Sequence, residues 1–220
     1  DAGEGTTVTV PHFSKTITVN PASLTLSLTG DTPSPSTVGQ AYAVTFTYTV
    51  NSPGSGTPTG SVTVTDGTDS CTGTIASGTC NLTSTTAGTK SLTATYVNDG
   101  NYTGSTTAGR THTVNKGTPT ITWAAPTTIT YGTALSAAQL NATASVPGTF
   151  VYTPALDTVL NAGSSQTLHV DFTPMSTADY NTASKDVTIT VNKGTLTITA
   201  DNKTNQYGTG LPTLTASYSG

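Results

Sequence analysis

The sequence predicts an all-β protein made of several β-sandwich domains in tandem. The first observation is composition: charged residues make up 8% of the chain, against about 25% in an ordinary soluble protein. Threonine is the commonest residue, and 22 glycines and 12 prolines punctuate the sequence. Thr, Val, Ile and Tyr favour strands, whereas Gly and Pro favour the turns between them.

The second observation is strict alternation of apolar and polar residues. It is strongest from Tyr42 to Val50, where Tyr, Val or Phe occupies every second position and Thr fills three of the four positions between. Alternation at period two is typical of a strand with one buried face. The third observation is a short phrase that ends in Val-Asn and recurs at Asn20, Asn115 and Asn192. Such a phrase at domain-sized intervals indicates a tandem array.

Each copy of the phrase is interpreted as the last strand of one domain plus the link to the next. We therefore expect residues 1–20 to be the C-terminal strands of a preceding Ig-like domain. Residues 21–115 form a complete sandwich and residues 116–193 a smaller one. Residues 194–220 begin a further unit that is too short for a core of its own. Either the chain continues or another molecule completes its sheet.

Seven strands are expected in the first complete domain. The apolar pairs Val62/Val64 and Leu92/Ala94 mark two of them. The segments on either side of Ala76-Ser77-Gly78 predict a hairpin. Seven short strands, each with one buried face, are typical of two packed sheets.

The second domain opens with Ile121 and Trp123, and Trp123 is expected in its core. Residues 134–140 form the one stretch with the composition for a helical turn. The alternation at Leu168, Val170 and Phe172 predicts a central strand, whose outward residues include His169.

The charge pattern limits the classes of partner. The net charge of −4 is thinly spread and forms no basic patch, which argues against nucleic acid. No apolar run approaches the roughly 20 residues that span a bilayer, so no membrane insertion is expected in this segment. No cofactor is expected.

Two cysteines, Cys71 and Cys80, lie close together in the sequence. In a Thr-rich, charge-poor β chain this pair fits a disulfide formed in an oxidising compartment. Metal binding is the weaker interpretation, because no histidine or second Cys pair accompanies them. The bridge is expected to hold the predicted hairpin together.

Three segments resemble repeats of large bacterial extracellular proteins. The first domain resembles bacterial Ig-like repeats through VGQAYAVTFTYTV (38–50), GTPTGSVTVTDG (56–67) and TKSLTATYVNDGNYTGSTT (89–107). The stretch 121–154 is similar to MBG-type repeats, and TITADNKTNQYG (197–208) resembles the opening of another. The resemblance implies Ig-like sandwiches in a rod, an extracellular or bacterial cell-surface location and no catalytic residues. Such repeats often carry a close Cys pair.

No constellation of residues predicts a reaction or a metal site. There is no Gly-x-Ser-x-Gly elbow, and the histidines lack a recognisable carboxylate network. His112 is expected at a strand end, and His169 with Asp171 on an exposed surface. Asp66 and Asp69 fall short of the six to eight oxygen ligands that calcium takes and fit a turn instead.

The sequence therefore predicts a non-enzymatic repeat segment, the stalk or spacer of an adhesin-like surface protein. Its partners would be neighbouring Ig-like repeats of the same or another chain. Two alternatives stay open. One is a filament subunit assembled by strand exchange between chains. The other is a carbohydrate-binding module that recognises glycans or host-surface ligands, with Tyr102, Tyr180 and Tyr207 as its candidate aromatic residues.

Overall fold

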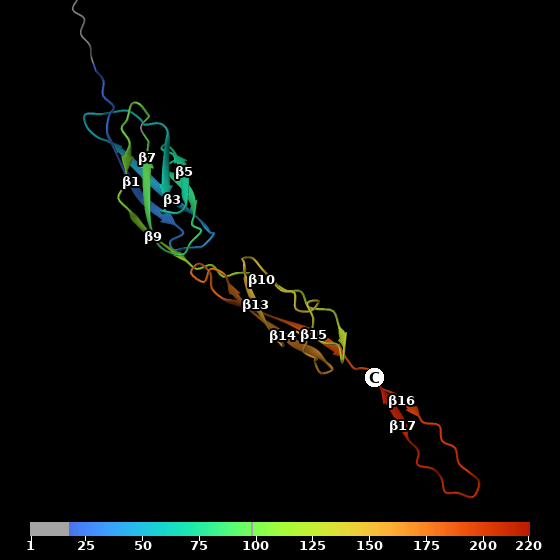
Figure 1. Ribbon diagram of the computed structural model, residues 1–220. Coiled ribbons are helices and arrows are strands. Elements are labelled where there is room, and N and C mark those ends of the chain that lie inside the picture. Colours follow the sequence, from blue (N-terminus) through green and yellow to red (C-terminus); the bar gives the residue numbers. More distant parts are fainter. Residues whose placement is uncertain (1–17, 98) are drawn as a thin grey trace, which may run out of the picture. The chain divides into compact units, whose positions relative to one another are not determined.

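A computed structural model of the protein describes residues 18–97 and 99–220. The expected strands of a preceding domain, apart from residues 18–20, lie outside the described residues. The structure is all-β: every regular element in the described part of the chain is a strand. The chain divides into two compact units (Figure 1). It passes from the first unit to the second near Val114.

Among the described residues, nine strands form the two sheets of the first sandwich. These are two more than the seven expected, because alternation does not reveal strands of only two residues. The alternating residues of the sandwich's longest strand decide which face is buried: Tyr42, Val44 and Phe46 point inward, whereas Ala43 is half-buried and Thr45 is exposed. One sheet has the order β1 (Leu24–Thr32), β3 (Ala41–Val50), β6 (Thr79–Thr83). The other has the order β2 (Ser36–Thr37), β9 (Arg110–Asn115), β7 (Gly88–Tyr96), β4 (Ser61–Thr65), β5 (Ser70–Thr74), with β8 (Ser105–Thr106) beside β7.

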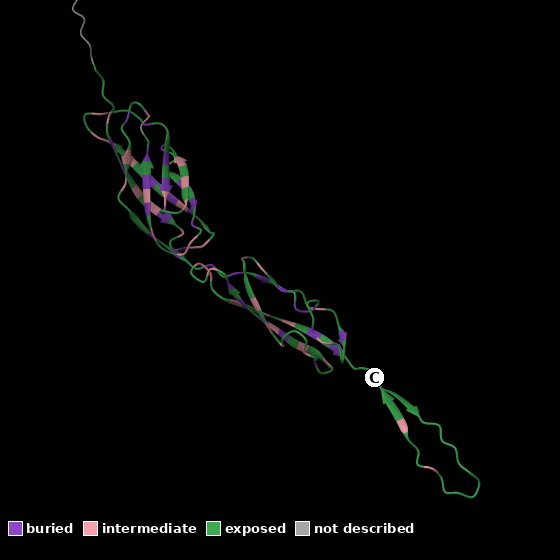
Figure 2. Ribbon diagram, viewed as in Figure 1, coloured by how far each residue is buried: buried purple, intermediate pink, exposed green. Residues whose placement is uncertain are grey.

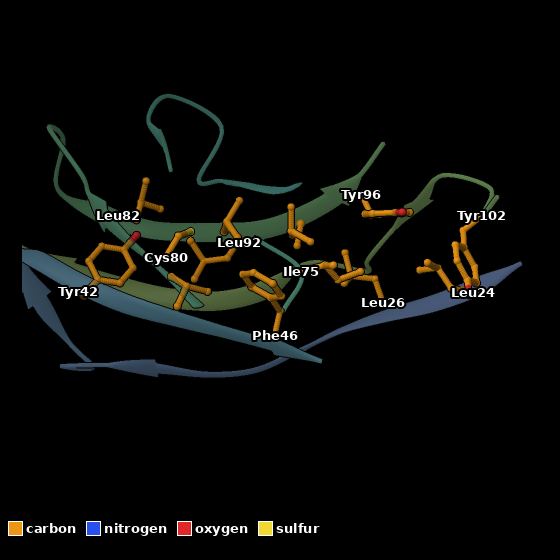
Figure 3. Close-up of a cluster of buried hydrophobic side chains, with 14 residues drawn as sticks. Leu24, Leu26, Tyr42, Phe46, Ile75, Cys80, Leu82, Leu92, Tyr96 and Tyr102 are labelled. Carbon is orange, nitrogen blue, oxygen red and sulfur yellow. The ribbon is translucent and has the colours of Figure 1, made fainter. Parts of the chain in front are cut away.

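Apolar side chains from both sheets fill the space between them. Leu82 of β6 and Leu92 of β7 are fully buried there, with Phe46 of β3 beside them (Figure 3). Leu24 and Leu26 of β1 and the ring of Tyr102 extend this core along its length. The fold is the two-sheet sandwich that the alternation predicts.

The predicted hairpin around Ala76-Ser77-Gly78 is wrong. The strand before this turn, β5, pairs with β4 in one sheet, whereas the strand after it, β6, pairs with β3 in the other. The turn therefore carries the chain from one sheet to the other. This crossover packs closely: a Cβ on Gly73 of β5 would clash with the carbonyl of Thr79 in β6.

The second sandwich has a larger and a smaller sheet around its own core. Leu168, Val170 and Phe172 of the central strand are fully buried, and Trp123 lies in the core as predicted. The stretch 134–140 contains one turn, in which the amides of Gln139 and Leu140 bond the carbonyl of Ser136. The larger sheet has the order β11 (Ile129–Thr130), β15 (Ala183–Asn192), β14 (Gly163–Pro174), β13 (Gly148–Thr153), and β10 (Ile121–Thr122) pairs with β12 (Thr143–Ala144).

The remaining residues form an antiparallel two-stranded sheet of β16 (Thr197–Ala200) and β17 (Ala216–Ser219). These strands pair only with each other among the described residues. The residues of β16 are all exposed, as are most of β17.

Candidate functional site

A buried polar network lies at one end of the first sandwich. His112 projects inward from β9, and its Nδ1 lies 2.7 Å from the Asp31 carboxylate of β1. Its Nε2 lies 2.8 Å from the hydroxyl of Ser36 in β2. Arg110, two residues before His112 and on the same face of β9, donates from Nε to the other Asp31 oxygen at 2.5 Å. Residues far apart in the sequence thus form a Ser-His-Asp chain.

A second polar layer stacks on the first. The ring of Tyr42 lies parallel to the imidazole of His112, with 4.0 Å between centroids and 15° between planes. Its hydroxyl lies 3.0 Å from Ser84, which in turn donates to the carboxylate of Asp66 at 2.5 Å. The other oxygen of Asp66 accepts the amide hydrogens of Thr68 and Asp69. The two layers link both sheets through hydrogen bonds.

The surroundings of the two carboxylates keep them ionised. Burial acts to raise the pKa of Asp31, but hydrogen bonds from Arg110 and His112 outweigh it, so the pKa lies below its usual value. Burial also acts to raise the pKa of Asp66. Hydrogen bonds from the Ser84 hydroxyl and from two backbone amides outweigh this effect, so the pKa again lies below its usual value. Hydrogen bonds to the charged form favour that form, and here they replace the water that burial removes.

The connectivity of Ser36, His112 and Asp31 matches that of a hydrolase triad, but its accessibility does not. Ser36 and His112 are each 1% exposed, and Asp31 is 8% exposed. A nucleophilic serine must reach a substrate carbonyl beside oxyanion-hole donors. The three side chains are enclosed by the sandwich, so the arrangement stabilises the fold and presents no nucleophile.

This network corrects two sequence-based expectations. His112 lies within β9 in the core and not at a strand end, and it has the carboxylate partner that the sequence did not reveal. One signal was available: His112 shares the alternation phase of the buried Val114, so a polar residue pointed inward. A buried polar side chain needs a partner, but the sequence does not say which residue supplies it.

The disulfide joins Cys71 of β5 to Cys80 of β6, with 5.9 Å between their Cα atoms. Because β5 and β6 belong to different sheets, the bridge links the two layers of the sandwich. It does not connect paired strands of a hairpin, as the sequence suggested. Cys80 lies in the core beside Leu82 and Phe46 (Figure 3).

A carboxylate also organises the loops at the opposite end of the first sandwich. Asp99 accepts the amide and hydroxyl of Thr59 and the amides of Asn101 and Tyr102. Burial acts to raise the pKa of Asp99, but these hydrogen bonds outweigh that effect and hold the pKa well below its usual range. Burial and the nearby Asp99 charge raise the pKa of Tyr96 to about 12. Asp99 therefore holds the loop that contains Thr59 against its own loop by hydrogen bonds.

The histidine of the second sandwich lies on an exposed sheet face, as expected. His169 Nδ1 is 2.5 Å from Asp186 on the adjacent strand, and Nε2 is 3.2 Å from Asp171. Both hydrogen bonds raise the pKa of His169. The two carboxylates bind opposite edges of the ring, so they do not converge on one point with it. Among the described residues no group of three His, Cys, Asp or Glu is arranged to hold a metal ion.

Two other groups of candidate residues can be placed. The carboxylate of Asp66 is used by its own turn and by Ser84, which fits the predicted turn role. Of the candidate glycan-binding tyrosines, Tyr102 is buried and donates its hydroxyl to the carbonyl of Ser55, so its ring is part of the core. Tyr180 is half-buried and Tyr207 fully exposed, and they belong to separate segments.

Residues 28–115, which hold the buried network and the disulfide, match the family model described as bacterial Ig-like domain (group 3). This stretch is similar to bacterial Ig-like domains. A search of the curated proteins found no match.

Among solved structures, the fibronectin(III)-like modules of CbhA from Clostridium thermocellum match with 17% identity and a TM-score of 0.30, over 76% of this chain and 94% of theirs. The described residues include no helix that could cross a bilayer.

Proposed function

We propose that the chain is a non-enzymatic structural segment of a bacterial extracellular protein, in which the sandwiches serve as a spacer on the cell surface. The observation that carries this proposal is the enclosed Ser36–His112–Asp31 network of a domain that matches bacterial Ig-like domains. These three side chains, which most resemble a catalytic group, are enclosed in the sandwich and connect three of its strands by hydrogen bonds. A segment with that design supplies mechanical and thermodynamic stability.

The interior of each sandwich supports this role. No buried side-chain nitrogen or oxygen of the described residues lacks a hydrogen-bond partner. The bridge between Cys71 and Cys80 fits folding outside the reducing cytosol. We extend the proposal to MBG-type repeats at residues 116–193 and 194–220, and to a rod-like succession of domains whose partners are neighbouring repeats.

Surface display can be tested on the bacterium that produces the protein. Antibodies raised against residues 21–115 should label intact cells as strongly as permeabilised cells. Brief protease treatment of intact cells should remove the signal, with a cytosolic protein as the control that survives. Labelling that requires permeabilisation would refute the proposed location.

The absence of hydrolysis can be tested separately. A fluorophosphonate probe reacts with activated serines, and we expect it to leave Ser36 unlabelled in the folded protein. Labelling that is lost in Ser36→Ala but kept in Ser84→Ala would show an accessible nucleophile and contradict the structural role. Of the two alternatives, the filament is favoured by one observation, the uncovered sheet β16–β17. The carbohydrate-binding module is not favoured by any.

A further inference from the structure

The strand β13 forms one edge of the larger sheet in the second sandwich. Among the described residues it pairs with β14 only, so one side of its backbone has no strand partner. None of its six residues is buried, and Val151 is 62% exposed. Figure 2 shows the contrast: purple segments mark the core of this sandwich, whereas β13 is coloured only as exposed or intermediate. A free strand edge of this kind can accept another extended chain.

The edge strands of the first sandwich are closed by contacts within the chain. The amide of Leu26 in β1 donates to the hydroxyl of Ser105 in β8 of the other sheet at 3.3 Å. The edges β5 and β6 are joined to each other by the disulfide between Cys71 and Cys80. The strand β13 has no bond of either kind, and its sequence GTFVYT contains none of the charged residues that keep many natural edges apart.

The side chains of β13 follow the same order in both directions from Val151. An aromatic residue and then a threonine come before it, as Phe150 and Thr149, and after it, as Tyr152 and Thr153. When two antiparallel copies of the strand pair with Val151 opposite Val151, Phe150 lies opposite Tyr152 and Thr149 lies opposite Thr153. Each cross-strand pair then joins residues of one kind, and aromatic pairs and Thr–Thr pairs stabilise antiparallel sheets.

We propose that β13 is an interaction edge for β13 of a second copy of this chain, with the two strands antiparallel around a two-fold axis at Val151. A strand whose order of side chains is the same in both directions suits a two-fold interface, because the same residues must serve on both sides. The paired edges join two four-stranded sheets into one continuous sheet.

The residues around β13 permit this register on both faces of the sheet. On the inner face, the half-buried rings of Phe150 and Tyr152 stack with 6.3 Å between centroids, and pairing covers apolar surface that they leave exposed. On the outer face, Asp171 lies beside Val151. The two Asp171 residues of a pair are three strand spacings apart, about 14 Å. This separation exceeds the Debye length of about 8 Å at physiological salt, so their repulsion is largely screened.

Pairing of two isolated chains through this edge is weak. A strand edge of six residues buries less than the roughly 800 Å² per partner that a stable interface needs. Chains held side by side on a surface pair more readily, because tethering raises their effective concentration. The inference deepens the proposed function, on which it rests, since β13 then joins neighbouring spacers.

Single cysteines introduced into the full chain test the register. In Val151→Cys the two thiols lie opposite each other, at the Cα separation of about 4.5–5.5 Å of paired antiparallel residues, which a disulfide spans. In Thr149→Cys they lie about 14 Å apart, because Thr149 is opposite Thr153. The matched control is Thr188→Cys, whose thiol is exposed on the same face of the sheet but lies on the internal strand β15.

The natural cysteines do not interfere, because Cys71 and Cys80 are bonded to each other. Each variant is oxidised by air with a copper catalyst at the same protein concentration, and disulfide-linked dimers are measured on non-reducing gels. We expect the Val151→Cys dimer to form at least about 10-fold faster than the Thr188→Cys dimer. Thr149→Cys alone should match the control, but its mixture with Thr153→Cys should give the mixed dimer quickly.

Equal rates for Val151→Cys and Thr188→Cys would overturn the proposal. A fast dimer of Thr149→Cys alone would also overturn it, because that dimer requires a different register. Neither result bears on surface display, which the cell-labelling experiment tests, and a failure of surface display leaves the rates of dimer formation unchanged.

Discussion

The buried network makes the Asp31→Ala substitution the most informative perturbation of the first sandwich. The substitution removes the acceptor for both His112 and Arg110. The side chain of Arg110 is 42% exposed and can be hydrated, whereas that of His112 is fully buried and keeps an unpaired ring nitrogen. An unsatisfied buried donor costs about 1–3 kcal/mol. We therefore expect the unfolding free energy to fall by about 1–3 kcal/mol.

Urea unfolding followed by far-UV circular dichroism measures this loss. The single tryptophan, Trp123, belongs to the core of the second sandwich. Its fluorescence therefore reports the other domain in the same sample and should keep its midpoint. Asp171→Ala, a surface carboxylate beside a histidine, is the matched control, with an expected change within about 0.5 kcal/mol.

A double variant separates the unpaired group from other effects. In Asp31→Ala with His112→Leu, no buried imidazole is left without its acceptor, so part of the stability should return. The pH dependence gives a second check. Because the pKa of Asp31 is lowered in the folded state, its contribution is present above the unfolded value of about 3.9 and is lost as the pH falls through the folded value. A loss below about 1 kcal/mol for Asp31→Ala at neutral pH would refute the network's role.

Three further predictions concern the disulfide, the second core and the exposed histidine. Replacing Cys71 and Cys80 together by Ser should lower the unfolding free energy of the first sandwich by about 2.7 kcal/mol in the chain-entropy description of a ten-residue loop, measured by urea titration; an unchanged midpoint would contradict a stabilising bridge. Leu168→Ala, at a fully buried position, should cost about 2–5 kcal/mol and shift the Trp123 fluorescence transition, whereas Val151→Ala on the exposed face should leave it in place. NMR titration should show the pKa of His169 above its usual value and lowered by Asp186→Asn; since the shift is upward, its stabilisation is present below the unfolded pKa and is lost as the pH rises through the folded value.

The alternation of apolar residues was sufficient to predict the longer strands of the first sandwich and the central strand of the second, but not the two-residue strands β2 and β8. The stripe from Tyr42 to Val50 became β3, and Leu168, Val170 and Phe172 became the buried face of β14. Alternation works because a strand with one buried face must place every second residue inside. It does not identify the partner of a strand. The turn at Ala76-Ser77-Gly78 therefore suggested a hairpin, although it connects the two sheets.

The candidate site was the part that the sequence concealed. Asp31, Ser36 and His112 come from three strands, and their meeting depends on how the two sheets close. The inward phase of His112 was the only local signal, and it names a buried polar residue without naming its partner. The exposed pair His169 and Asp171 was easier to predict, because both residues lie on one strand at positions two apart.

If this chain is a mechanical spacer of independently folded sandwiches, it should unfold in discrete steps when it is pulled between its ends in a force spectrometer. We expect two separate unfolding events, one for each sandwich. For the first, the extension should increase by about 30 Å when reduction of Cys71–Cys80 releases the nine residues that the bridge holds back. Gradual lengthening without discrete events, or an extension unaffected by reduction, would contradict the account.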